Sequence, residues 1–384
     1  MKNFICCLYL CLAEVLISQN TYPIILIHGF LGWGRDEMAG YYYWGGKTDL
    51  ESELKSAGFE VFTVSVGPIS PNWDRAIEAF YQIKGGQVDY GNEKAENLGI
   101  IQQPEGKLYK GLYPQWDSDH PVHIIGHSQG GLTAKMLEVL LKTTFPDEDS
   151  PLLSQSYKGW IASITTISTP HNGTTLVPLM LDVFPFIINL VPWLGGIENE
   201  KINGLYNFDL EHWKLERKPN ESLKNYFSRI KQSPVSNEKN LCTWDLSIDG
   251  ANEFNSGYIP DTNVYYFSLP TYSTQKKNNK ATHKPDKNMA IHLWPTGILM
   301  GNDEKAPDSS WFENDGICNT VSMTTIGDIE MSIYEGEASK GVWMKLPPVN
   351  LDHQAIIGHH AGKAGREDLV VLYNTHCKLL YSLK

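Results

Sequence analysis

The chain has 384 residues, enough for one large α/β domain or two smaller ones. Its 41% hydrophobic and 20% charged residues are typical of a soluble globular protein. The formal net charge of −12 argues against nucleic acid as a partner, because no surplus of lysine and arginine is present to neutralise phosphates. The same charge disfavours simple electrostatic docking of the whole chain to anionic membranes.

The first 19 residues have the pattern of a signal peptide. Lys2 supplies a positive charge, residues 4–13 form a short apolar core, and a polar stretch follows at residues 18–20. We therefore expect residues 1–19 to be removed on secretion, which leaves residues 20–384 as an extracellular protein. A buried N-terminal helix is the alternative, but the first predicted strand begins so soon that little room remains for it.

The mature chain would keep three cysteines, Cys242, Cys318 and Cys377. No two of them have Cys-x-x-Cys spacing. An odd number of this kind allows at most one disulfide and excludes a disulfide framework.

Short apolar runs alternate with helical patterns along the chain. The predicted strands comprise residues 23–28, 59–66, 122–125, 161–167 and 264–269, and the predicted helices comprise residues 47–57, 75–83 and 132–141. Continuous β-branched runs of this length are typical of strands buried on both faces of a parallel sheet. The alternation therefore predicts an α/β fold, with a mostly parallel, doubly wound sheet and helices on both faces, in one domain over residues 20–384.

Two insertions interrupt this alternation. The first, residues 85–116, is polar and rich in glycine. The second, residues 174–200, is apolar, and Asp182 is the one charged residue between positions 176 and 196. Prolines at positions 178, 185 and 192 would break a membrane-spanning helix into short pieces. A buried core helix and a mobile flap over an apolar cleft both remain possible, and glycines at positions 195 and 196 favour the flap because they offer a hinge.

The pattern Gly-x-Ser-x-Gly occurs at residues 126–130, directly after a predicted strand and before a predicted helix. In this context the pattern predicts a nucleophile elbow, with Ser128 on a strained strand-to-helix turn. A Cβ atom at either flanking glycine would clash across so tight a bend. An ordinary glycine turn is the alternative.

A serine hydroxyl needs a base to take its proton, and in this kind of fold the acid and then the histidine follow the serine in the chain. His353 follows the last extended run and is the predicted base. His359 and His360 come at the next turn, where a solvated or structural role is expected.

The predicted acid is Asp315, which stands before a glycine in the turn Glu313-Asn-Asp-Gly316. Such a turn is expected to expose a carboxylate at a loop tip. Asp308 and Asp328 are the alternatives. The role of the acid would be to hold His353 in the correct tautomer and to stabilise its charged form.

Two backbone N–H groups are needed to stabilise the oxyanion. One is expected from Gln129, the residue after the nucleophile. The other is expected from Phe30, which follows the first strand in His28-Gly-Phe30, because Gly29 allows the backbone to approach closely. A plain turn is the alternative for His-Gly-Phe.

Four segments carry a resemblance to a known family: residues 28–34, 66–76, 169–175 and 313–323. In them the chain resembles the large secreted triacylglycerol lipases of Gram-positive bacteria, the staphylococcal type. The similarity extends from about residue 22 to about residue 360. The resemblance implies an α/β-hydrolase fold.

The family's motif positions fall on residues of this chain. Its Ser-Asp-His triad falls on Ser128, Asp315 and His353, and its oxyanion donors fall on Phe30 and Gln129. The segment after Thr175 corresponds to the family's lid, which favours a flap over a buried helix.

The family also carries a zinc site of two aspartates and two histidines. The aspartates correspond to Asp74 and Asp245, but the histidine positions hold Lys94 and Ile100. Neither lysine nor isoleucine binds zinc, so we expect the metal to be lost and the Lys94 ammonium to offset the two carboxylates. The family's calcium ligands follow the catalytic histidine, and residues 354–361 contain no carboxylate, so we expect no calcium site and no metal cofactor.

Together these patterns predict a secreted serine lipase or esterase that hydrolyses acylglycerol esters at an oil–water interface. An esterase or acyltransferase acting on other lipid esters would use the same triad. A lipid-binding protein that kept the fold without the catalysis is a third possibility.

Overall fold

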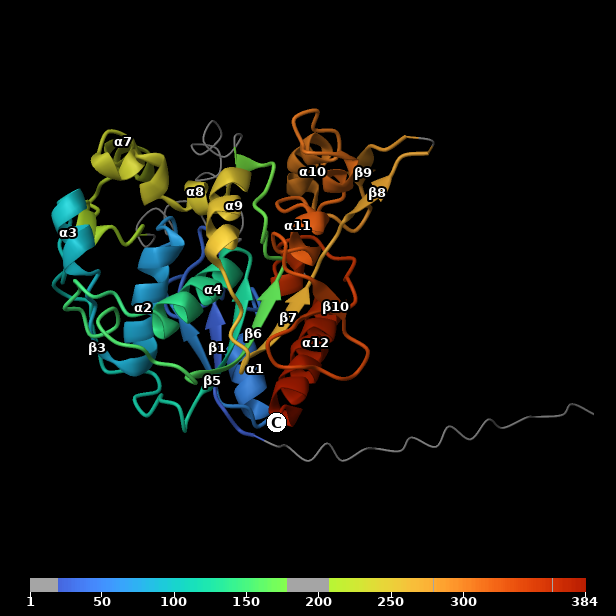
Figure 1. Ribbon diagram of the computed structural model, residues 1–384. Helices are drawn as coiled ribbons and strands as arrows, with labels where there is room; N and C mark the ends of the chain where they lie inside the picture. The colour runs from blue at the N-terminus through green and yellow to red at the C-terminus, as the bar shows by residue number, and fades with distance from the viewer. Residues whose placement is uncertain (1–19, 178–206, 279, 361) are drawn as a thin grey trace, which may run out of the picture.

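A seven-stranded parallel sheet forms the centre of the computed structural model, which describes residues 20–177 and 207–384 apart from residues 279 and 361. Its strand order is β10-β11-β7-β6-β5-β1-β2, and Figure 1 shows the sheet between its covering helices. The strands are β1 (Ile24–Ile27), β2 (Val61–Val64), β5 (Val122–His127), β6 (Ile161–Ile167), β7 (Tyr265–Leu269), β10 (Met331–Ile333) and β11 (Trp343–Lys345). Every neighbouring pair is parallel, which confirms the predicted α/β fold.

Helices cover both faces of this sheet. The described helices are α1 (Leu50–Ser56), α2 (Asn72–Lys84), α3 (Asn92–Leu98), α4 (Gln129–Lys142), α7 (Leu223–Lys231), α8 (Cys242–Leu246), α9 (Ile248–Gly257), α10 (Trp294–Met300), α11 (Thr320–Thr324) and α12 (Lys363–Ser382). Helices α1 and α12 pack on one face, and α2 and α4 pack on the other. Strand β1 is apolar throughout because both of its faces are buried. Ile24 and Leu26 belong to the core on one face of the sheet, and Ile25 and Ile27 belong to the core on the other.

Two small antiparallel sheets lie outside the central one. Strands β3 (Gly86–Gln87) and β4 (Leu108–Tyr109) pair within the glycine-rich insertion at residues 85–116, which also carries α3. Strands β8 (Thr274–Lys276) and β9 (His283–Pro285) form a hairpin beside α10.

The three cysteines of the described chain, Cys242, Cys318 and Cys377, are buried free thiols, so the single disulfide that the sequence allowed is not formed among them. None of the described helices is long and apolar enough to cross a bilayer. The predicted signal peptide at residues 1–19 and most of the predicted lid, from residue 178 onward, lie outside the described residues.

Candidate active site

Ser128 lies between β5 and α4 with φ 57° and ψ −128°, a backbone conformation that residues other than glycine rarely adopt. A Cβ atom on Gly126 would lie 2.4 Å from the Gly130 carbonyl, and one on Gly130 would lie 2.1 Å from the Ile27 oxygen. Both positions therefore exclude any larger residue. The predicted strand, strained turn and helix are all present in the predicted order.

His353 and Asp315 form a hydrogen-bonded pair. The Nδ1 atom of His353 lies 2.8 Å from Oδ2 of Asp315. The Thr271 hydroxyl donates to the same oxygen at 2.8 Å. The backbone N–H groups of Ile317 and Cys318 donate to the other oxygen at 3.0 and 2.8 Å. With its carboxylate held from four sides, Asp315 fixes the orientation of the His353 ring.

The prediction that Asp315 lies at an exposed loop tip was wrong, because its side chain is fully buried. The turn from Asn314 to Asn319 folds inward, and Gly316 at φ 96° allows the reversal. The carboxylate then lies beneath the imidazole, where backbone donors replace the water that it has lost. The sequence indicated a turn but not the direction in which the turn faces.

Ser128 and His353 line the same cavity, of about 120 Å³. The other lining residues are mainly apolar or aromatic: Phe30, Leu31, Trp33, Tyr43, His127, Leu176, His292, Leu293, Ile317, Gln354, Ile357 and His359. The rings of His127 and His353 lie 4.6 Å apart between centroids. The candidate nucleophile and base, which are far apart in sequence, therefore meet in one apolar cleft.

The two alternatives for the base are placed differently. His359 is buried, with its Nε2 atom 2.9 Å from the Tyr43 carbonyl oxygen, and His360 is exposed.

Cys318 is a neighbour of Ser128 that the sequence did not single out. Burial and the nearby Asp315 carboxylate raise the pKa of its thiol well above the usual value, and Ser128 lies within hydrogen-bonding reach. The thiol therefore stays protonated beside the serine.

The two candidate oxyanion donors flank the serine. Gln129 is the first residue of α4, so its N–H has no partner within the helix and points out of the positive end of the helix dipole. Phe30 lines the cavity beside Ser128. A Cβ atom on Gly29 would lie 2.7 Å from that of Ser128, so glycine is needed for the loop to approach.

Tyr43 and Arg75 hold the loop that carries Phe30, and sequence reasoning missed both. The Tyr43 hydroxyl accepts a hydrogen bond from the Gly29 N–H at 2.8 Å and lies 2.6 Å from Nδ1 of His127. The buried guanidinium of Arg75 donates to the His28 carbonyl and, at 2.7 Å, to the Gly67 carbonyl. No local pattern signals these roles, because each contact joins residues far apart in the chain.

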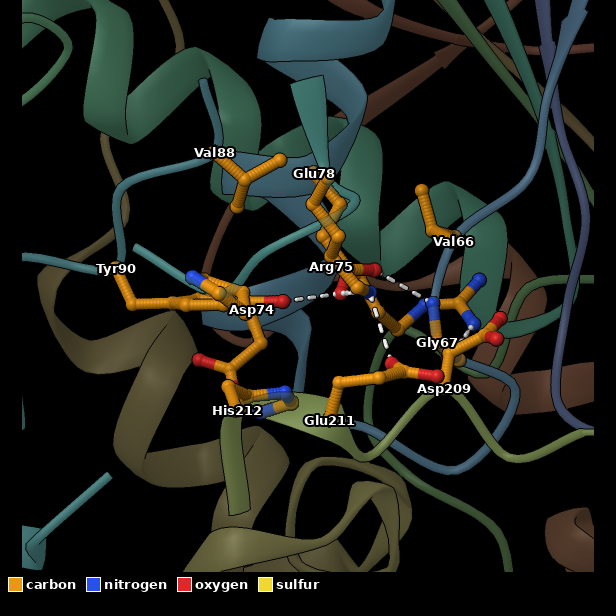
Figure 2. Close-up of polar contacts among 12 residues, drawn as sticks. Val66, Gly67, Asp74, Arg75, Glu78, Val88, Tyr90, Asp209, Glu211 and His212 are labelled. Atoms are coloured by element: carbon orange, nitrogen blue, oxygen red, sulfur yellow. Dashed lines mark hydrogen bonds and ion pairs between the residues drawn. The ribbon is translucent and has the colours of Figure 1, made fainter. Parts of the chain in front are cut away.

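Two of the four residues that correspond to the family's zinc site, Lys94 and Asp74, form a buried ion pair here. Nε2 of His212 lies 3.2 Å from the second oxygen of the Asp74 carboxylate, and Figure 2 shows His212 beside Asp74. Although burial opposes ionisation, Lys94 and His212 hold the pKa of Asp74 at about 2. Burial raises the pKa of Asp245 to about 7, and its side chain accepts the Asn72 N–H at 2.6 Å.

These residues do not fit a zinc ion. A zinc site needs free electron pairs, whereas a lysine ammonium occupies the Asp74 carboxylate, and a second cation there would be repelled. His212, which stacks on Tyr90 with ring centroids 4.3 Å apart, is a partner that the sequence analysis did not identify.

A second buried charge cluster holds the insertion at residues 85–116. Lys107 Nζ lies 2.8 Å from Glu78 on α2 and 3.7 Å from Glu211. The Tyr90 hydroxyl donates to Glu78 at 2.5 Å, and Figure 2 shows these acidic groups and the tyrosine converging. Although burial opposes the charge, Glu78 raises the pKa of Lys107 above its usual value. Side-chain ion pairs thus connect the insertion to the sheet-covering helix α2.

Comparisons with known proteins agree with this fold and identify the family. The family model described as "Lipase-like, C-terminal domain" matches residues 20–380. Lipase 1 of Staphylococcus aureus is 33% identical over 362 residues, which cover 91% of this chain and 52% of that protein. The chain therefore spans about half the length of the curated relatives that it matches.

Two solved structures are similar over nearly the whole chain. EstA from Clostridium botulinum has a TM-score of 0.87 and 35% identity, over 97% of this chain and 90% of that one. Lipase 1 from Pelosinus fermentans has a TM-score of 0.82 and 35% identity, over 95% of this chain and all of that one, 100%.

Proposed function

Since this chain belongs to the family of lipase-like C-terminal domains, we propose that it is a serine hydrolase that cleaves the ester bonds of acylglycerols. The observation that carries the proposal is the meeting of a strained serine and a carboxylate-bound histidine in one apolar cleft. Acyl chains fit such a lining, because most of the surface that it exposes is apolar.

In the proposed mechanism, the Ser128 hydroxyl turns toward Nε2 of His353, which takes the proton as the oxygen attacks the ester carbonyl. Asp315 keeps the other ring proton on Nδ1 and stabilises the charged ring. The protonated His353 then donates to the leaving alcohol. Water attacks the acyl-serine by the same sequence of proton transfers, which releases the fatty acid and restores the hydroxyl.

The oxyanion that forms during each attack would be held by the backbone N–H groups of Phe30 and Gln129. These donors are fixed before the substrate arrives, because Tyr43 and Arg75 hold one loop and α4 holds the other. Donors that need no rearrangement are worth the most in an apolar cleft.

We further propose that residues 20–384 act as one secreted hydrolase domain after removal of residues 1–19, and that residues 174–200 act as a lid. The support is the sequence: an apolar leader at the N-terminus, and an apolar, proline-interrupted segment that follows Thr175. Leu176, at the start of that segment, lines the cleft. N-terminal sequencing of the protein recovered from the culture medium tests the processing site.

The test of the proposed function is the rate of fatty-acid release from short triacylglycerols as their concentration passes the solubility limit. We expect slow hydrolysis below the limit and a steep rise once emulsion droplets form, because a lid that moves aside at a lipid surface opens the cleft fully only there. A smooth saturation curve without the rise would contradict the lid, and the absence of any fatty acid would contradict the hydrolase. A longer-chain series then measures acyl preference.

We also propose that the enzyme needs no metal ion. Chelation should leave both the activity and the melting temperature unchanged.

Lys94→Met should lower the free energy of unfolding by about 3 kcal/mol, because the Asp74 carboxylate is then buried without its main cation. The matched control is Lys239→Met, whose exposed pair with Glu253 should cost less than about 1 kcal/mol. Thermal unfolding of the three proteins measures this difference. Stoichiometric zinc in the purified protein, or a reversible loss of activity on chelation, would refute the proposal.

A further inference from the structure

The short 3₁₀ turn at Ile291–Leu293 continues directly into α10, and together they present an apolar stripe to solvent. Ile291, Trp294, Ile298 and Leu299 are between 41% and 73% exposed. Their spacing of three, four and one residues places them on one face of a helix. Scattered exposed apolar residues are ordinary, but a continuous helical face of them marks an interaction site.

The helix that carries this stripe is packed against the rest of the protein. The opposite side of α10 is buried through Leu293, Gly297 and Met300. A Cβ atom on Gly297 would lie 2.8 Å from the sulfur of Met289, so α10 packs closely against the Met289 side chain. The indole of Trp294 donates to the Met289 carbonyl at 3.0 Å, which fixes the half-exposed ring. The exposed face is therefore rigid.

The stripe adjoins the cleft. Leu293, at the junction of the turn and α10, lines the cavity of Ser128 and His353. Leu299 lines a second cavity, of about 660 Å³, together with Thr175 and Val177 at the start of the proposed lid. A surface that covered the stripe would therefore lie at the entrance to the candidate active site.

Positive charge gathers next to this face. The β8–β9 hairpin is bound to the end of α10 by a hydrogen bond from the His283 N–H to the Gly301 carbonyl, at 2.7 Å, and Figure 1 shows the two elements side by side. The hairpin and the loop after it carry five lysines and one acid, which are Lys276, Lys277, Lys280, Lys284, Lys287 and Asp286. All of these lysines except the half-buried Lys277 are exposed. The chain that follows α10 carries Asp303, Glu304, Lys305 and Asp308 instead, so the basic residues are those of the hairpin and of the loop after it.

We propose that the stripe on α10 and the lysines of the β8–β9 hairpin dock this protein on an anionic lipid surface, with the cleft facing that surface. The inference rests on the proposed function and gives it a location. Apolar side chains and a fixed tryptophan enter the boundary between headgroups and acyl chains, and lysines beside them attract negatively charged headgroups. A chain with a net charge of −12 is repelled by such a surface as a whole, so a local basic cluster is needed to orient it.

The experiment measures partition onto vesicles of phosphatidylcholine with and without phosphatidylglycerol, by flotation, in proteins that all carry Ser128→Ala so that binding is separated from turnover. Ile291→Ser combined with Ile298→Ser should lower partition by about tenfold, since two branched side chains no longer enter the lipid. The matched control is Ile259→Ser combined with Ile333→Ser, which removes two isoleucines that are 73% and 66% exposed elsewhere and should leave partition unchanged.

The electrostatic part has its own pair of variants. Lys284→Gln combined with Lys287→Gln should lower partition onto the anionic vesicles by about thirtyfold and leave partition onto the neutral vesicles unaffected, since each lysine near such a surface contributes about 1 kcal/mol. The control is Lys158→Gln, an exposed lysine outside the hairpin. Equal partition of the test and control variants, or equal binding to both vesicle types, overturns the proposal.

Two further readouts separate the alternatives. With Ser128 intact, the isoleucine variants should hydrolyse a short soluble ester at the wild-type rate, and a parallel loss would place these residues in the cleft instead and overturn the surface role. A melting temperature that falls in Ile291→Ser/Ile298→Ser but not in its control would show that the stripe is covered by the chain itself, which also overturns it. If the wild type hydrolyses no soluble ester while vesicle binding follows the prediction, the proposed function fails and the docking surface stands.

Discussion

Replacing Ser128 with alanine is expected to lower the rate of ester hydrolysis by roughly 10⁵- to 10⁶-fold, the loss typical of removing a catalytic serine. The hydroxyl is the one group at the elbow that can form the acyl-enzyme, and the backbone that presents it does not depend on the oxygen. The fold should therefore be unchanged, because alanine can keep the same strained turn between Gly126 and Gly130. Initial rates on a soluble 4-nitrophenyl ester measure the loss.

A matched control is available in Ser70→Ala. Ser70 is fully buried, and its hydroxyl has no hydrogen-bond partner among the described residues. Its removal should leave the rate unchanged. Labelling by a fluorophosphonate probe should occur in the wild type and in Ser70→Ala but not in Ser128→Ala. More than about a tenth of wild-type activity in Ser128→Ala would contradict the proposed nucleophile, since residual rates without a serine are several orders of magnitude lower.

The sequence predicted those features that local chemistry determines. The bounds of β6 match the predicted run at residues 161–167, because β-branched residues dominate it and favour a buried strand. Helix α4 begins at Gln129, three residues before the predicted start at 132, because the elbow itself opens the helix. Glycine has a low helix propensity, so Gly130 and Gly131 concealed this first turn. They are needed there for close packing against Ile27 and Thr169.

Contacts between distant segments were harder to predict. The ion pair between Lys94 and Asp74 was expected, because the resemblance placed a lysine where a metal ligand is found. His212 was missed, since it reaches Asp74 from 138 positions away and nothing in its surroundings indicates a buried partner. The burial of Asp315 was missed for a similar reason: a turn with Asp before Gly is ordinarily exposed, and only the packing of Thr271 and His353 around it reverses the side chain.

Asp315→Asn is expected to lower the rate of hydrolysis by about 10⁴-fold while the protein stays folded. The carboxylate accepts from four donors, and a carboxamide of the same shape can retain some of them. The carboxamide cannot, however, accept the Nδ1–H hydrogen bond of His353 through its nitrogen. An amide nitrogen facing Nδ1 forces the ring proton onto Nε2, which is the atom that must accept the proton of Ser128. The base is then present in the wrong tautomer, so the loss should fall on the catalytic rate and not on substrate affinity.

The two aspartates that competed for this role supply the control. Asp308→Asn and Asp328→Asn change exposed carboxylates on the surface, and each should leave the rate within about twofold of wild type, as is usual for surface substitutions away from a site. Fluorophosphonate labelling adds a second readout, because the attack of the serine on the probe also requires the base, so labelling should slow in Asp315→Asn alone. If Asp308→Asn or Asp328→Asn lost activity instead, the triad would have a different acid, and the buried pair of Asp315 and His353 would be a structural contact. The geometry favours Asp315, because its buried carboxylate lies 2.8 Å from His353, which lines the cleft together with Ser128.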